Sequence, residues 1–138
     1  MVAFKRLKPI QPSDHTLLRE IYLDSIEGSA HIFYSKEQIQ AWSSLAFLSG
    51  VLDKSFSEGQ GWKSLESNEV VAFAIRYPME RLALLYCRSA FTRRGHATAL
   101  INQTELDALQ EGLISLRTEA SFFSYPLLIR LGWTLLFV

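Results

Sequence analysis

The sequence lacks the features that mark several large classes of protein. It has one cysteine, Cys87, so it forms no internal disulfide and gives no sign of secretion. Lysine plus arginine and aspartate plus glutamate each number 14, so the net basic charge that duplex nucleic-acid binding requires is absent. No run of about 18 apolar residues could span a membrane, and the first residues lack the apolar core of a signal peptide. We therefore expect a cytoplasmic protein that binds neither nucleic acid nor a membrane.

The sequence also lacks the spacing of a zinc site. Cys87 and the three histidines His15, His31 and His96 stand far apart, so we predict no metal. The chain does have 49% hydrophobic and 20% charged residues, a balance typical of a folded core. A length of 138 residues fits one domain, so we treat residues 1–138 as a single domain.

Apolar periodicity divides the first part of the chain into a strand and two helices. Residues 2–8 alternate loosely and predict a strand. Helical spacing predicts a helix over residues 14–27, with Gly28 as its end. Ser35 followed by Gln38 has the form of a capping box, so a second helix begins after Ser35. The apolar face of that helix would carry Ile39, Trp42 and Ala46.

The middle of the chain predicts an antiparallel meander. The polar residues 50–59 indicate a loop, and strands follow over residues 61–66, 70–75 and 82–87. Residues 70–75 are an unbroken apolar run, which is typical of a strand covered on both faces.

Four further elements complete an α/β (α+β) order of β-α-α-β-β-β-α-β-α-β. They are a helix that follows Gly95 and ends before Gly112, a strand over residues 113–118, a helix that begins near Pro126 and ends at Gly132, and an extended final segment, 133–138.

Residues 92–97, TRRGHA, form a short basic loop between a buried strand and a helix. A helix N-terminus leaves backbone N–H groups unpaired and favours anions such as phosphate. Gly95 has no Cβ to block a close approach, and Arg93 and Arg94 add charge. The loop matches neither the P-loop nor the dinucleotide-binding motif. It is therefore either a phosphate-binding loop of another kind or an ordinary basic turn that caps a helix.

The order of elements and four segments resemble the GNAT superfamily of acyl-CoA-dependent N-acetyltransferases. Residues 92–97 resemble its pyrophosphate loop, Gln/Arg-x-x-Gly-x-Gly/Ala, and depart from it at Thr92. Residues 85–91, LYCRSAF, resemble its strand-end pattern Leu-Tyr-Val-x-Pro-x-Tyr, with Ser89 in place of proline. Segments of its YafP-like branch are similar to YSKEQIQAW at 34–42 and to EASFFSYP and LGW at 119–126 and 131–133. The resemblance implies a three-layer fold with a mixed central sheet flanked by helices, here with a shortened C-terminal hairpin.

The resemblance also implies that acetyl-CoA is the cofactor and that the main chain binds most of it. Free backbone amides of Leu85, Tyr86 and Cys87 would hold the pantetheine arm and polarise the thioester carbonyl. Ser121 would contact the pantetheine. The pyrophosphate would lie on the amides of Arg93, Arg94, Gly95, His96, Ala97 and Thr98.

The implied reaction is direct attack of a small-molecule or peptide amine on the thioester, without a covalent enzyme intermediate. Many relatives place a proton-donating tyrosine where this chain has Leu128, so Tyr125 or Ser124 is the candidate acid. Alternatively, Tyr125 packs against other side chains or forms a wall of the substrate site. Glu119 is either a base or an ion-paired surface carboxylate. Cys87, in an apolar strand, is interpreted as structural.

His31 and Tyr34 border the region where relatives bind the acceptor, so they are candidate substrate contacts, whereas Trp42 is predicted to pack in the core. His96 is expected to be partly exposed. The apolar segment 133–138 would be an edge strand, which a second copy of the chain would cover to form a homodimer. Two rival functions stay open: a CoA-binding module without efficient catalysis, and a protein-interaction domain without a cofactor.

Overall fold

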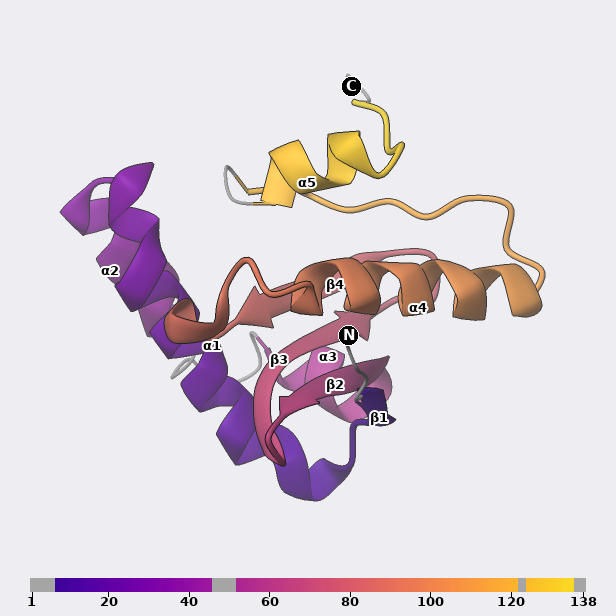
Figure 1. The fold of residues 1–138 in the computed structure, drawn as a ribbon, viewed down its shortest axis with the longest axis horizontal. Helices are drawn as coiled ribbons and strands as arrows, with labels where there is room; N and C mark the ends of the chain where they lie inside the picture. Colours follow the sequence, from indigo (N-terminus) through magenta and orange to yellow (C-terminus); the bar gives the residue numbers. More distant parts are fainter. Residues whose placement is uncertain (1–6, 46–51, 122–123, 136–138) are drawn as a thin grey trace.

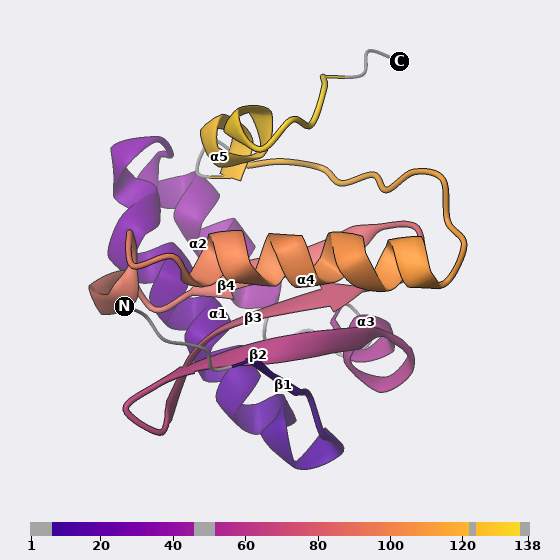
Figure 2. The same ribbon diagram turned by 45° about the vertical axis from the view of Figure 1, so that its right-hand side comes forward.

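The computed structural model describes residues 7–45, 52–121 and 124–135, and these form three layers (Figure 1). The middle layer is an antiparallel sheet in the order β1-β2-β3-β4. Its strands are β1 (Leu7–Pro9), β2 (Gln60–Glu66), β3 (Glu69–Arg76) and β4 (Leu82–Cys87). One side carries α1 (His15–Ser29), α2 (Lys36–Ser44) and α3 (Asp53–Glu58); the other carries α4 (His96–Gln110) and α5 (Ser124–Arg130) (Figures 1 and 2).

Strand β3 is buried on both faces, as its unbroken apolar run predicts. Phe73 and Ile75 pack into the core beneath α1 and α3, while Ala72 and Ala74 face α4 and α5. The two alanines are small, so the backbone of α4 can approach the sheet closely. This close approach fixes where the first turn of α4 lies relative to β4.

Local sequence signals place several element ends correctly. Ser35 and Gln38 form the predicted capping box, in which each backbone N–H donates to the other residue's side-chain oxygen. Gly112 follows α4 with a φ of +86°, a conformation that glycine adopts without steric cost. Pro126 lies in the first turn of α5, and Gly132, with a φ of +99°, follows its end.

Two predictions in the first half were wrong. Residues 53–58, within the expected loop, form the short helix α3, because Phe56 inserts into the core and anchors one turn and a half. Gly28 does not end the first helix, since α1 continues through Ser29. It instead lies where Ser89 comes close, and a Cβ on Gly28 would stand 2.4 Å from the Ser89 hydroxyl oxygen.

The predicted strand over residues 113–118 was also wrong, because this segment finds almost no backbone partner. Within the described residues it makes one isolated bridge, parallel, between Arg117 and Arg81, and Ile114 is fully exposed. Parallel pairing in the described sheet is limited to this bridge. Residues 133–135 form no strand. The other predicted strand positions, 2–6 and 136–138, and Ala46 lie outside the described residues.

Candidate active site

The start of α4 presents a run of backbone N–H groups without partners. Among the described residues, no carbonyl or side chain accepts from the amides of residues 93–98, and the first amide that is bonded is that of Ala99, which donates to Gly95 at 3.0 Å. Arg93 and Gly95 have φ values of +64° and +88°, so the chain curls around this point. Successive amides in such a curl form a concave site for an anion. The geometry favours the phosphate-binding interpretation of the loop over a plain basic turn.

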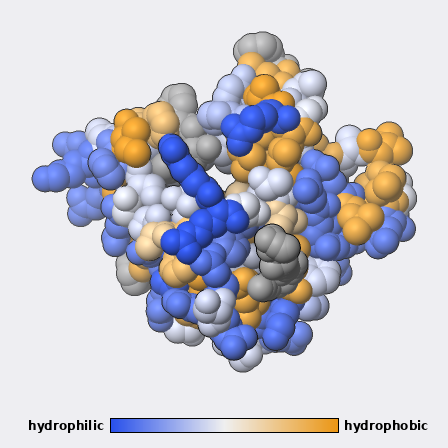
Figure 3. All heavy atoms as spheres, in the orientation of Figure 1, coloured by the Kyte–Doolittle hydropathy of each residue, from blue (hydrophilic) through white to orange (hydrophobic). Residues whose placement is uncertain are grey.

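Gly95 is required here for its backbone conformation. Its φ of +88° is strained for any residue with a Cβ. A Cβ added there would meet nothing within 4 Å, so the space above Gly95 is open. Figure 3 shows strongly hydrophilic atoms over the start of α4. A group that approaches the backbone at Gly95 would therefore meet no steric obstacle at this position.

A partly buried polar network holds this loop against β2. The Nε2 of His96 lies 2.7 Å from a Glu66 oxygen, and its Nδ1 lies 2.7 Å from the hydroxyl of Ser64. The second Glu66 oxygen accepts from Arg94. The hydrogen bond from His96, followed by that from Arg94, keeps the pKa of Glu66 below its usual value, although burial opposes this. His96 is half-buried, with 10% of its side chain exposed, in agreement with the expectation of a partly exposed residue.

The Ser64–His96–Glu66 chain has the bonding order of a catalytic triad, but its position rules out nucleophilic catalysis. Ser64 is 3% exposed and lies within β2, so no substrate carbonyl can reach its hydroxyl. The network therefore acts on the loop: it fixes the two side chains that flank Gly95. Sequence reasoning missed Glu66 and Ser64 because they are some thirty residues away from the loop.

The outer edge of β4 carries further free backbone groups. The backbone N–H of Arg88 donates to the carbonyl of Val71 in β3 at 2.8 Å. The preceding residue, Cys87, is paired with Ala72 of β3. Antiparallel alternation then points the N–H of Tyr86 toward β3 and those of Leu85 and Cys87 toward the open edge. Of the three predicted amides, two are thus on the edge and that of Tyr86 is not.

The segment that would cover this edge diverges from it. The backbone N–H of Leu82 donates to the carbonyl of Arg117 at 2.9 Å, and the Thr118 hydroxyl donates to the carbonyl of Leu82 at 2.7 Å. Beyond Thr118 the chain lifts away toward α5 (Figure 2). Among the described residues, the edge of β4 from Leu85 onward has no backbone partner.

Two side chains of β4 are held in their protonated forms. Burial raises the pKa of the Cys87 thiol to about 12, and the nearby carboxylates of Glu66 and Asp24 act in the same direction. The Cys87 sulfur donates to the Phe91 carbonyl at 3.5 Å. Burial also raises the pKa of Tyr86 to about 12. A protonated, half-buried thiol is a poor nucleophile, in agreement with a structural role for Cys87.

The predicted residues around α5 lie at its start. The hydroxyls of Ser121 and Ser124 are 3.3 Å apart, and each accepts from the other's backbone N–H, at 3.1 and 3.2 Å. Tyr125 is 41% exposed. Glu119 is an exposed carboxylate 2.7 Å from Arg81, with Arg117 also close. Leu128 is 3% exposed in the core between α4 and α5.

The predicted acceptor-side residues lie next to an aromatic cluster on the α1 side of the sheet. Tyr34 packs edge-on against Trp42 with ring centroids 5.2 Å apart, and the Trp42 indole N–H donates to the Tyr86 hydroxyl at 3.4 Å. The Tyr22 ring packs against the Tyr86 ring in a tilted arrangement, with centroids 4.7 Å apart. Trp42 therefore packs, as predicted. His31 is exposed on the connection between α1 and α2.

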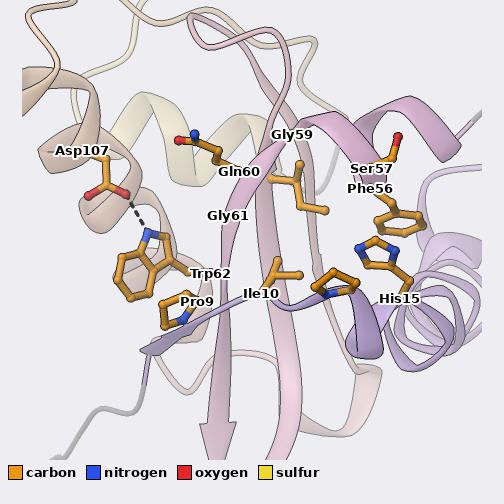
Figure 4. A pocket seen from close by; sticks show the side chains of 12 residues that line it. Pro9, Ile10, His15, Phe56, Ser57, Gly59, Gln60, Gly61, Trp62 and Asp107 are labelled. Carbon is orange, nitrogen blue, oxygen red and sulfur yellow. Dashed lines mark hydrogen bonds between the residues drawn. The ribbon is translucent and has the colours of Figure 1, made fainter.

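A hollow of about 530 Å³ opens elsewhere, between β1, β2, α3 and the C-terminal half of α4 (Figure 4). The Trp62 indole, which lies there, donates to Asp107 at 2.6 Å. Asp107 is 11 residues along α4 from His96, about 16 Å. None of the described lining residues belongs to the predicted site. The hollow is therefore separate from the amides at the start of α4.

The described residues contain no cluster of three or more potential metal ligands. They also contain no helix whose length and apolar character would suit a membrane span.

The chain is similar to solved structures of N-acetyltransferases. The structure described as the GCN5-related N-acetyltransferase "Aminotransferase, Class-II" from Rhodopseudomonas palustris is 26% identical, with a TM-score of 0.89 over 96% of this chain and 83% of that one. PaiA N-acetyltransferase from Thermoplasma acidophilum, solved with coenzyme A, is 14% identical, with a TM-score of 0.68 over 94% and 91%. An aminoglycoside acetyltransferase from an uncultured soil sample is 15% identical, with a TM-score of 0.67 over 96% and 93%.

These similarities define the class of fold: the chain has the fold of the GCN5-related N-acetyltransferases, as the sequence motifs imply. No protein-family model and no curated protein matches the chain.

Proposed function

We propose that this protein is an acyl-CoA-dependent N-acetyltransferase that transfers the acetyl group of acetyl-CoA to an amine. The observation that carries the proposal is the run of unpartnered amides at residues 93–98 beside the open edge of β4. The fold supports it, since PaiA N-acetyltransferase, which shares the fold, was solved with coenzyme A. The motifs quoted above further suggest the YafP-like branch of the superfamily.

The two groups of amides would bind the two ends of one ligand. The diphosphate would lie on the amides of residues 93–98, where the dipole of α4 favours negative charge. The N–H groups of Leu85 and Cys87 would donate to the thioester carbonyl oxygen and stabilise the negative charge that develops on it. Ser121 would contact the pantetheine, as predicted.

In the proposed reaction, a neutral amine attacks the thioester carbonyl carbon directly. The new C–N bond forms, the C–S bond breaks, the amine nitrogen loses a proton to a base, and the thiolate of CoA leaves and takes up a proton. We propose Tyr125 as the donor of that proton, because its side chain is exposed at the start of α5. Ser124 is a second candidate acid and Glu119 a candidate base, but each would have to exchange its present partner for the substrate.

The acceptor would approach from the side of α1 and α2, past His31 and Tyr34. Aminoglycoside acetyltransferases share this fold, which supports a small-molecule amine, and a peptide amine is the alternative. The identity of the amine is set by side chains around the site rather than by the fold.

A CoA-binding module without efficient catalysis is the second candidate. Leu128 occupies the position where many relatives carry the proton-donating tyrosine, and it is buried in the core at 3% exposure. No proton can come from that position, so catalysis depends on a group that has taken over this role.

Thermal melting with acetyl-CoA, followed by an assay of free-thiol release over a panel of amines, tests both candidates. We expect acetyl-CoA to raise the melting temperature, because a ligand of the native state stabilises it. Thiol release with at least one amine supports the transferase, and binding without release supports the second candidate. No thermal shift would overturn both.

Gly95→Leu and Gly112→Leu form a matched pair for this test. Both glycines have a φ near +87° and open space around the missing Cβ, at opposite ends of α4. Each substitution should therefore cost a similar stability, on the order of 1 kcal/mol. Only Gly95→Leu should abolish the shift with acetyl-CoA.

A further inference from the structure

One hydrogen-bonded contact ties α1 to the segment between β4 and α4. A single carboxylate oxygen of Asp24 accepts from the backbone N–H of Ser89 at 2.8 Å and from its hydroxyl at 3.3 Å. The two residues are 65 positions apart, and both are partly buried. A backbone N–H that donates to a carboxylate makes a stronger bond than a neutral pair.

The surface of α1 leaves room for this contact. Ser89 lies directly over Gly28, where an added Cβ would be 2.4 Å from the Ser89 hydroxyl oxygen and 2.6 Å from its Cβ. Any larger residue at position 28 would push Ser89 away from Asp24. Asp24 and Gly28, one helical turn apart, thus form one docking point for Ser89.

Ser89 sets the path of the chain between the two groups of free amides. It is the first residue of the 3₁₀ turn Ser89–Phe91, which is separated from β4 by Arg88 alone, and its carbonyl accepts from the hydroxyl of Thr92 at 3.2 Å. The far end of the loop is held separately, by Glu66 through Arg94 and His96. Asp24 therefore anchors the near end of the loop.

We propose that Asp24 is a positioning residue for cosubstrate binding, an inference that rests on the proposed function. Through Ser89, Asp24 fixes the spacing between the β4 edge, which would receive the thioester arm, and the amides of residues 93–98, which would receive the diphosphate. A ligand that spans both places gains affinity from their preorganisation. A ligand that reaches only the amides does not depend on the spacing.

The test is titration calorimetry of the full chain with CoA and with ADP, which carries a diphosphate and lacks the pantetheine arm. Asp24→Ala removes the anchor, so we expect CoA to bind about tenfold more weakly, while ADP affinity changes less than about twofold. Asp24→Asn keeps an oxygen that accepts from Ser89, so it should restore most of the CoA affinity. Glu20→Ala removes an exposed charge from the same helix and should change neither affinity.

Equal losses of CoA and ADP affinity would overturn the proposal, because they would indicate general damage to the fold. Asp24→Asn behaving like Asp24→Ala would also overturn it, since charge rather than the hydrogen bonds would then matter. Gly28→Ala displaces Ser89 by contact and should give the same selective loss if Asp24→Ala fails to fold. Wild-type protein that binds no CoA would refute the proposed function itself; tight CoA binding by every variant would refute only the role of Asp24.

Discussion

Arg93 and Arg94 are neighbours in the sequence, but their side chains have different surroundings. Arg94 pairs with Glu66, and its guanidinium lies 5.0 Å from the Phe91 ring centroid. Arg93 has no hydrogen-bond or ion-pair partner in the part of the chain that the structure describes. Since a guanidinium already paired with a carboxylate contributes less net charge to a ligand, Arg93 is the residue expected to contact phosphate.

Replacing each arginine by alanine separates these roles. Arg93→Ala should weaken CoA binding about tenfold at low salt and reduce the dependence of affinity on ionic strength, because one phosphate contact is lost. Arg94→Ala should have the smaller effect on affinity. Titration calorimetry at several salt concentrations measures both; a larger loss with Arg94→Ala would contradict the assignment.

Cys87 should be unreactive in the folded protein. With a pKa of about 12, its thiolate fraction at pH 8 is on the order of 10⁻⁴, so alkylation by iodoacetamide should be roughly a thousandfold slower than for a free thiol. The denatured chain should react at the ordinary rate. Cys87→Ala should keep transferase activity; a rapid reaction in the native state, or loss of turnover in this variant, would refute the structural role.

At the scale of elements, β2 and α4 are joined by the Glu66 carboxylate, and this junction predicts a pH dependence. The pKa of Glu66 is lower in the folded than in the unfolded protein, so the folded form binds fewer protons in acid. Its stabilisation is therefore present above pH 4.5, the ordinary pKa, and is lost as the pH falls through the lowered folded value.

Urea unfolding of the wild type and of Glu66→Gln between pH 7 and pH 3 measures this effect. The stability difference between the two should shrink as the pH falls. A difference that stays constant, or grows, would show that the charge of Glu66 does not stabilise the junction.

Elements whose signals are local were predictable from the sequence. The capping box at Ser35 and the left-handed Gly112 depend on a few neighbouring residues, and the run 70–75 reports burial directly. The strand expected over 113–118 did not form because a strand needs pairing along its length, and this segment meets the edge of β4 only near Arg117, which periodicity does not reveal. The short helix α3 was missed because Phe56 is its one buried residue, and a single buried residue produces no apolar periodicity.

In the candidate site, too, the features that depend on neighbouring residues were predictable and those that depend on distant residues were not. The free amides at the start of α4 follow from a glycine, a basic loop and a helix start, all adjacent in the sequence. Glu66 and Asp24, which hold that loop from two sides, come from β2 and α1 and leave no pattern near the residues they bind. Tertiary hydrogen bonds of this kind are visible only once the chain is folded.

At the scale of the whole molecule, exposed apolar side chains lie at the C-terminal end of α4 and in the segment that follows (Figure 3). Leu109 is 71% exposed and Ile114 fully exposed. The homodimer was expected through an edge strand over 133–138, but the described residues 133–135 form no strand. Exposed apolar residues commonly mark contact surfaces, so we propose Leu109 and Ile114 as the interface of a homodimer instead.

Light scattering tests the prediction of a homodimer. A dimer would have a mass of about 31 kDa, twice 15.7 kDa, and Leu109→Glu should shift it toward the monomer, because a charge opposes burial. A monodisperse species of 15.7 kDa in the wild type would refute the dimer.

We propose that main-chain amides at the start of α4 and on the edge of β4 bind an acyl-CoA. The most direct measurement is the ¹H–¹⁵N correlation spectrum of the labelled protein during titration with CoA. We predict that the amide signals of residues 93–98, together with Leu85 and Cys87, shift most. Saturable CoA binding that leaves these signals in place and moves others would show that CoA binds elsewhere on the protein.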